Sequence, residues 1–264
     1  MSDAGIRIGT SGYSFADWVG PFYPPGTSRS DFLGYYATQF DTVEVNSTYY
    51  RMPHPRVLEQ MQRRTPPTFH FIVKLHRTMT HEISRDPALY RDFLSLLDPL
   101  KAADKYDGLL AQFPWGFKRT PENRRHLLFL RERLPEEPLF VEFRHDSWLT
   151  PELEPGLRAH RLGYCAVDEP RLPGLMPPVT MLTAEDAYVR LHGRNADNWW
   201  GRGGGDRYDY DYSKAELEEW VRKIADLAQR ARSTYVFFNN CHAGHAARNA
   251  KLMQELLRQQ QLPA

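Results

Sequence analysis

The residues of this chain that could do chemistry come in pairs, two positions apart, at the ends of short apolar runs. Three pairs stand out: Glu44 with Asn46, Glu142 with Arg144, and Arg190 with His192. Residues i and i+2 of a β-strand point to the same face, so each pair would present both side chains to one space. Carboxylates, guanidinium groups and an imidazole gathered there could bind an anion and transfer protons.

Other apolar runs also end in polar or charged residues, namely Lys74, Gln112, Asp168 and the Asn239–Asn240 pair. Burying such groups costs several kcal/mol each unless they are paired. One interpretation is therefore a salt-bridge network that neutralises itself, with Glu44, Glu142 and Asp168 against Lys74, Arg144 and Arg190. The other is a ligand site, which we favour because functional sites are where proteins tolerate such arrangements.

We predict candidate site residues from the polar ends of these apolar runs and from the loops that follow the runs. The candidate catalytic residues are Glu44, Glu142, Asp168 and His192. The candidate ligand-binding residues are Tyr13, Asn46, Lys74, Gln112, Arg144, Trp148, Arg190, Arg194, Trp199, Asn239 and Asn240. A long glycine-rich loop, Gly193–Tyr212, is typical of a lid. Its aromatic rings offer stacking faces, and Arg194, Arg202 and Arg207 offer contacts to anions.

The elements that must position these residues alternate along the chain. Eight short β-branched and apolar runs, separated by helix-like segments, span Ile6–Thr10, Thr42–Asn46, Phe69–Lys74, Gly108–Phe113, Leu139–Arg144, Gly163–Asp168, Ala187–His192 and Tyr235–Asn239. This repeat predicts an α/β protein of the (β/α)₈ TIM-barrel type, formed by one domain over residues 1–264. A doubly wound open sheet is the competing architecture. We favour the barrel because there are eight runs and no GxGxxG follows the first.

Local sequence signals predict where several helices begin and which connection between strands lacks a helix. Ser213 and Glu216 have the spacing of a capping box before a helical apolar period. Pro121 and Pro151 fall where helices should begin. The segment Glu169–Asp186 has four prolines and no helical period, so we expect an irregular connection between the sixth and seventh strands.

Composition narrows the class of protein. The 264 residues include 34 basic and 33 acidic ones, a net charge of +1, which argues against a purely electrostatic nucleic-acid binder. Two distant cysteines, Cys165 and Cys241, exclude a disulfide framework and suit a reducing compartment. We see no signal peptide and no apolar run of membrane-spanning length, so we expect a cytoplasmic protein without a membrane partner.

Seven stretches of the chain resemble the YecE-like family, which is catalogued as domain of unknown function 72. They are Ile8–Tyr13 with Trp18 and Phe22–Pro24, Val43–Tyr50, Thr80–Glu82, Gln112–Pro114, Val141–His145 with Ser147–Trp148, Val189–Arg194, and Phe238–Asn240 with Asn249–Ala250. They run through nearly the whole chain in order. The resemblance implies a TIM-type barrel and no settled activity.

Three functions remain open. We favour a metal-free site, without a cofactor, that binds an anionic phosphorylated or nucleotide-like ligand, with carboxylate and His192 acid–base chemistry. A metal-dependent isomerase, epimerase or endonuclease IV-like enzyme is the first alternative. Xylose-isomerase-like barrels bind a metal through Glu, Asp, His and Glu, and this chain offers Glu142, Asp168 and His192 but then an asparagine. Non-catalytic nucleic-acid binding is the second alternative, and a glycosidase using Glu44 and Glu142 is a weaker variant.

Four histidines outside these pairs have simpler interpretations. His76 and His81 are predicted to be surface histidines. Cys241, His242 and His245 could bind zinc, but three ligands on one loop are a weak signal, and the segment is better explained as the start of the final helix, at Gly244.

Overall fold

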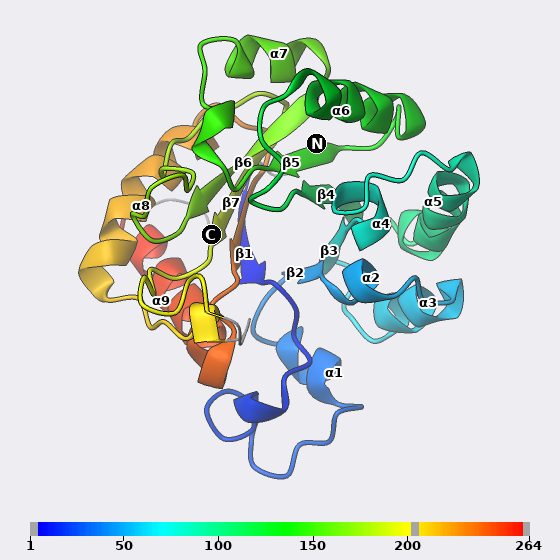
Figure 1. Ribbon diagram of the computed structural model, residues 1–264. Coiled ribbons are helices and arrows are strands. Elements are labelled where there is room, and N and C mark those ends of the chain that lie inside the picture. The colour runs from blue at the N-terminus through cyan, green and yellow to red at the C-terminus, as the bar shows by residue number, and fades with distance from the viewer. Residues whose placement is uncertain (1–4, 202–205, 261–264) are drawn as a thin grey trace.

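A computed structural model describes residues 5–201 and 206–260. Its strands form one sheet that curls into a nearly closed barrel (Figure 1). The strands are β1 (Ile6–Thr10), β2 (Thr42–Val45), β3 (His70–Lys74), β4 (Tyr106–Gln112), β5 (Leu139–Glu142), β6 (Leu162–Asp168), β7 (Ala187–Leu191) and β8 (Thr234–Phe238).

The order of the strands decides between the two architectures. Each strand pairs in parallel with its neighbour in the sequence from β2 to β8, and β8 pairs in parallel with β1. A parallel bridge between Ser11 and Glu44 joins the end of β1 to β2. This is the order of a (β/α)₈ barrel and not of a doubly wound sheet, whose strand order reverses at a switch point.

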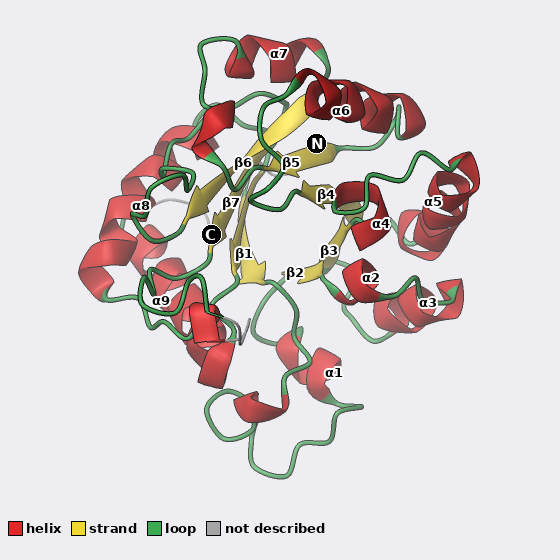
Figure 2. Ribbon diagram, viewed as in Figure 1, coloured by secondary structure: helices red, strands yellow, loops and turns green. Residues whose placement is uncertain are grey.

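Helices surround the strands on the outside (Figure 2). They are α1 (Phe32–Tyr36), α2 (Ser47–Tyr50), α3 (Pro55–Arg63), α4 (Arg77–Thr80), α5 (Pro87–Ala102), α6 (Pro121–Arg133), α7 (Leu153–Ala159), α8 (Lys214–Ala228) and α9 (His245–Gln259). Short 3₁₀ helices lie at η1 (Ala16–Trp18), η2 (Asp146–Trp148), η3 (Asp206–Tyr208) and η4 (His242–Gly244).

The predicted elements agree closely with the observed ones. Every predicted strand is present, with ends that differ by at most two residues. The connection over residues 169–186 contains no helix, as its prolines predict. Pro121 opens α6, whereas α7 begins at Leu153, two residues after Pro151.

Local capping explains where the last two helices begin. The Ser213 side chain accepts a hydrogen bond from the Glu216 N–H while the Glu216 carboxylate accepts one from the Ser213 N–H, which is the predicted capping box. The apolar face of α8 is buried against the barrel. Gly244 precedes α9 with φ of +77°, a left-handed conformation that glycine adopts at little cost.

Aromatic side chains fill the barrel interior below its carboxyl end. The Phe140 and Tyr188 ring centroids are 4.7 Å apart, and those of Tyr188 and Phe237 are 5.4 Å apart. A Cβ on Gly163 would lie 2.5 Å from Phe140 Cδ1, so only glycine leaves room for that ring. This packed layer forms a floor for any site at the carboxyl ends of the strands.

Among residues 5–201 and 206–260, no helix is both long and apolar enough to cross a membrane.

Glycine at position 9 should be needed for barrel closure. A Cβ there would lie 2.3 Å from the Thr42 carbonyl oxygen of the adjoining strand. We expect Gly9→Ala to lower the free energy of unfolding in urea by about 1–3 kcal/mol, the usual cost of overpacking. Gly156→Ala is the control, since Gly156 lies inside α7 with open space at its Cβ. This change should raise stability by about 0.5–1 kcal/mol, and equal effects of the two changes would contradict the packing argument.

Candidate functional site

Six side chains at the carboxyl ends of the strands form what we call the buried charge cluster. Its members are Glu44, Glu142, Arg144, Glu169, Arg190 and His192, and all are buried. They come from or directly follow β2, β5, β6 and β7. The alternation of side chains along each strand points them into the barrel rather than toward the helices.

Arg190 is the centre of this cluster. Its side chain is 1% exposed. Its Nη2 atom donates to Glu44 Oε1 at 2.7 Å and to Ser11 Oγ at 3.2 Å, and Nη1 donates to Glu142 Oε2 at 2.5 Å. The other oxygen of Glu44 accepts a hydrogen bond from the Tyr188 hydroxyl at 2.5 Å. One guanidinium therefore links β1, β2, β5 and β7 from inside the barrel.

Arg144 is the second guanidinium of the cluster, and it connects Glu142 to Glu169. Its Nε donates to Glu142 Oε1, and its Nη1 donates to Glu169 Oε2 at 3.1 Å. Burial alone would raise the pKa of Glu142, but Arg144 and Arg190 together hold it well below its usual value. Glu142 is therefore a carboxylate with both oxygens occupied by guanidinium groups, which makes it a weak base.

Glu169 differs from Glu142 because it has one guanidinium partner instead of two. Burial raises its pKa to about 7 although Arg144 opposes the shift. Its Oε1 accepts the Met176 N–H at 3.0 Å, which holds the irregular connection after β6 against the cluster. Glu169 can therefore gain or lose a proton near neutral pH.

His192 is neutral in this environment. Burial and the charge of Arg144 lower its pKa to about 3. Its Nδ1 lies 3.0 Å from Asn239 Nδ2 and 3.4 Å from Arg144 Nη2, and both of these atoms are donors. Nδ1 must then accept, which assigns the proton to Nε2. Nε2 lies 3.3 Å from Glu142 Oε1, in a geometry too poor for a hydrogen bond.

Lys74 lies at the mouth beside the cluster. Its Nζ donates to Gln112 Oε1 at 2.8 Å and lies 4.4 Å from the centre of the Tyr49 ring. Within the described part of the chain it forms no ion pair. Burial and the charge of Arg190 lower its pKa to about 7.

Three half-buried groups lie near Lys74, namely Tyr49, His81 and Gln112. The predicted ligand residues Tyr13, Asn46 and Asn239 are also half-buried, and Asn239 contacts His192. His81 contributes a neutral imidazole, since burial and the charge of Lys74 lower its pKa to about 4. It precedes Ile83, whose φ of +56° is rare for a β-branched residue. His81 is thus more enclosed than the surface position that the sequence predicts.

The loop after β7 covers part of the cluster. Trp199 is 2% exposed, with its ring centre 5.9 Å from the Arg144 guanidinium carbon. The Tyr208 ring lies 6.4 Å from the His192 ring. Arg202, predicted as an anion contact, lies outside the described residues.

The sequence matches the family described as "Protein of unknown function DUF72" over residues 7–264. The chain belongs to the DUF72 family. It is 33% identical to the UPF0759 protein YunF of Bacillus subtilis, over 96% of this chain and 94% of YunF.

Two solved structures of the DUF72 family share its fold. A protein from Thermotoga maritima is 42% identical, with a TM-score of 0.90, over 96% of this chain and 99% of that one. One from Enterococcus faecalis is 27% identical, with a TM-score of 0.85, over 96% and 95% of the two chains.

Asp168 of this DUF72 protein is placed away from the buried charge cluster. Its carboxylate accepts hydrogen bonds from Arg194 at 2.8 and 3.2 Å and from the Tyr212 hydroxyl at 2.8 Å. It therefore points to the helix side of β6 and anchors the loop before α8. Glu169, one residue later, takes the inward position. Continuing the alternation from Cys165 and Val167 would have indicated this residue.

Two further predicted ligand residues of the DUF72 protein have structural partners. Asn240 donates to the Tyr210 carbonyl at 2.8 Å and to Asn249 Oδ1 at 2.7 Å, on the outer side of β8. Arg194, besides contacting Asp168, donates to Glu219 at 3.0 Å. Both residues hold the loop after β7 in place rather than facing the cluster. Ser11 and Tyr188, by contrast, contact the cluster although their types gave no signal.

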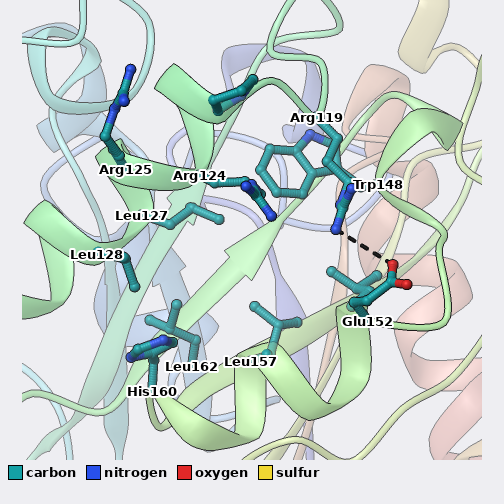
Figure 3. A pocket seen from close by; sticks show the side chains of 13 residues that line it. Arg119, Arg124, Arg125, Leu127, Leu128, Trp148, Glu152, Leu157, His160 and Leu162 are labelled. Carbon is teal, nitrogen blue, oxygen red and sulfur yellow. Dashed lines mark hydrogen bonds and ion pairs between the residues drawn. The ribbon is translucent and has the colours of Figure 1, made fainter.

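Trp148 of the DUF72 protein lines a different surface. It borders a pocket of about 440 Å³ between α6 and α7, outside the barrel (Figure 3). Its Nε1 donates to the Phe117 carbonyl at 2.6 Å, and its ring stacks on Phe143 at 4.2 Å. Arg119, on the rim of this pocket, pairs with Glu152 at 3.4 Å. None of the six cluster residues lines this pocket.

Removing the central guanidinium should destabilise the DUF72 protein strongly. Arg190→Met leaves Glu44 and Glu142 buried with too few partners, so we expect the free energy of unfolding in urea to fall by about 3–5 kcal/mol. Arg158→Met is the control, because Arg158 pairs with Glu154 at 2.8 Å on the surface, and it should cost about 0–1 kcal/mol. A loss below 1 kcal/mol for Arg190→Met would contradict the central role of this residue.

The protonation of His192 can be measured directly. With its pKa lowered to about 3, the ring should stay neutral, with the proton on Nε2, from pH 8 down to pH 5. Nitrogen-15 NMR of histidine-labelled protein checks this, with the His192→Gln variant assigning the signal and free histidine as the reference. A His192 signal that titrates above pH 5 would be the contrary result.

Proposed function

We propose that the barrel mouth binds a small anionic ligand, phosphorylated or nucleotide-like, with Lys74 as its cationic contact. The observation that carries this proposal is the state of Lys74. A cation that is nearly buried, held by one amide oxygen and one ring, has lost water without gaining a carboxylate. An anionic ligand would supply the missing charge.

The two arginines have a different role in this proposal. Arg144 and Arg190 are occupied by the carboxylates of the buried charge cluster, so they are not free to clamp a phosphate. They instead fix Glu142 beside His192. The anion contact thus moves from the arginines to the lysine.

Unsatisfied polar atoms also support a ligand at this place. Asn46 Oδ1, Arg190 Nε and His192 Nε2 are buried and have no hydrogen-bond partner within residues 5–201 and 206–260. Buried polar atoms almost always have a partner, which can be a ligand or an ordered water. In our proposal, the neutral His192 ring donates a hydrogen bond to the ligand through Nε2, and Glu169, with its pKa near 7, is the group best tuned for proton exchange.

The other hypotheses receive less support. A divalent cation among the carboxylates of the cluster would compete with two guanidinium groups, and Asp168 faces away from Glu142 and His192. A glycosidase that uses Glu44 and Glu142 is disfavoured as far as Glu142 is concerned, because the acid of such a pair needs a raised pKa and the pKa of Glu142 is held low. The proposed location remains the cytoplasm, because Cys165 and Cys241 are both free thiols.

Nucleic-acid binding is a second candidate, favoured by one patch near the mouth. The exposed rings of Trp115 and Trp200 lie 5.4 Å apart, and Lys118 Nζ is 4.8 Å from the centre of the Trp115 ring. Bases of a single strand could stack on such rings.

Binding of a simple anion tests the role of Lys74. Sulfate is the probe, because its charge stays constant between pH 6 and 8.5. With the pKa of free Lys74 lowered to about 7, the lysine is charged at pH 6 and mostly neutral at pH 8.5. Isothermal titration calorimetry should therefore find affinity about tenfold or more weaker at pH 8.5.

Two variants make this experiment specific. Lys74→Met should abolish sulfate binding. It should also raise the free energy of unfolding by about 0.5–2 kcal/mol, because it removes a nearly buried cation that has no carboxylate partner. Lys214→Met on the exposed face of α8 should change neither. Unchanged sulfate binding in Lys74→Met would overturn the proposal. Salt-sensitive binding of a short single-stranded oligonucleotide that survives Lys74→Met would favour the second candidate.

A further inference from the structure

A second cluster of metal-ligating side chains lies outside the buried charge cluster, where the loop after β7 meets the turn before α9. Asp209 comes from the loop, and His242 and His245 come from the turn. One ligand atom of each lies within 4.8 Å of the other two. Cys241 does not join them, because its Sγ donates to the Ser11 carbonyl at 3.5 Å.

The separations between these atoms suit a tetrahedral ion. His242 Nδ1 is 3.0 Å and His245 Nε2 is 3.3 Å from Asp209 Oδ1. Nitrogen and oxygen ligands at about 2.0–2.2 Å from a tetrahedral zinc ion lie about 3.3–3.5 Å from one another. Small side-chain rotations would bring all three atoms to that spacing.

The turn that carries the histidines is held by contacts that do not use them. Trp18 Nε1 donates to the Cys241 carbonyl at 2.6 Å, and the Ala243 N–H donates to Asp17 Oδ2 at 2.7 Å. Ala243 has φ of +47°, an uncommon conformation for alanine that these contacts maintain. The backbone that carries both imidazoles is thus in place before any ion arrives, which lowers the entropic cost of binding one.

The charges around the cluster are compatible with a cation. Asp211 Oδ2 lies 3.7 Å from His245 Nδ1 and accepts a hydrogen bond from Arg248 at 2.9 Å. The two aspartates and Arg248 leave one net negative charge beside the two imidazoles. Arg248 also contacts His245 Nδ1. An ion bound at His245 Nε2 therefore requires the Arg248 guanidinium to turn away from Nδ1 and toward Asp211. The Asp211 carboxylate then accepts the Nδ1 proton of His245 in a hydrogen bond and orients the imidazole.

We propose that Asp209, His242 and His245 bind one zinc ion, with water completing the tetrahedron. The ion would tie the loop after β7 to the start of α9. Asp209 lies between Tyr208, whose ring faces His192, and Tyr210, whose carbonyl accepts from Asn240. Zinc at this position would therefore fix the segment that borders the barrel mouth. The proposal does not depend on the identity of the anion bound there.

Direct binding tests the site. Untagged protein, stripped with a chelator, is titrated with zinc by calorimetry, and cobalt(II) is used as a spectroscopic probe of coordination. We expect one equivalent of zinc, and visible cobalt absorption of the strong kind that four-coordinate sites give. Hydrogen exchange of the amides at residues 208–212 should slow when zinc is added.

Three variants decide whether these residues are the ligands. Asp209→Asn keeps the size of the side chain, and His242→Ala removes an exposed imidazole, so both should fold normally. Each should weaken zinc binding at least tenfold and abolish the slowed exchange. His160→Ala is the control and should change nothing, because His160 is an exposed histidine at the end of α7. Absence of zinc binding at 100-fold molar excess, or full binding in both Asp209→Asn and His242→Ala, would overturn the proposal.

Discussion

The barrel depends on one interaction, the contact of the Arg190 guanidinium with Glu44 and Glu142 inside its carboxyl end. A buried guanidinium needs partners for its charge and its donors, and each buried carboxylate needs a cation. Arg190 meets both needs across β7, β2 and β5, and adds Ser11 beyond β1. The seam between β1 and β2, where the sheet closes through a single bridge, is therefore also held from inside by this side chain.

The pairing of the arginines determines the properties of the remaining groups. Because Glu142 receives both guanidinium groups, its carboxylate stays ionised, while Glu169, with one, has its pKa raised to about 7. Burial and the charge of Arg190 lower the pKa of Lys74 to about 7, and burial and the charge of Arg144 keep His192 neutral. A structural network thus creates the groups that can bind an anion and exchange protons, so the salt-bridge and ligand-site interpretations describe one arrangement.

The sequence identified most of this arrangement but not all of it. The period of two correctly placed Glu44, Glu142 and Arg190 on inward faces. On β6, Asp168 was selected only because it ends the apolar run; its carboxylate points outward, and Glu169 points in. A polar residue at the end of a strand is therefore a candidate site residue. Whether its side chain points into the barrel depends on whether it lies an even or an odd number of positions from the inward-facing residues of that strand.

The sequence by itself determined the eight strands, the irregular connection after β6 and the capping of α8 and α9, because these follow from patterns within a few residues of one another. Only the tertiary structure decided which cation meets which carboxylate. That choice depends on the register and curvature of strands far apart in the chain, as with Arg190 and Glu44, which are 146 positions apart. For the same reason, Asp209 meets His242 and His245 only once the barrel has brought two loops together.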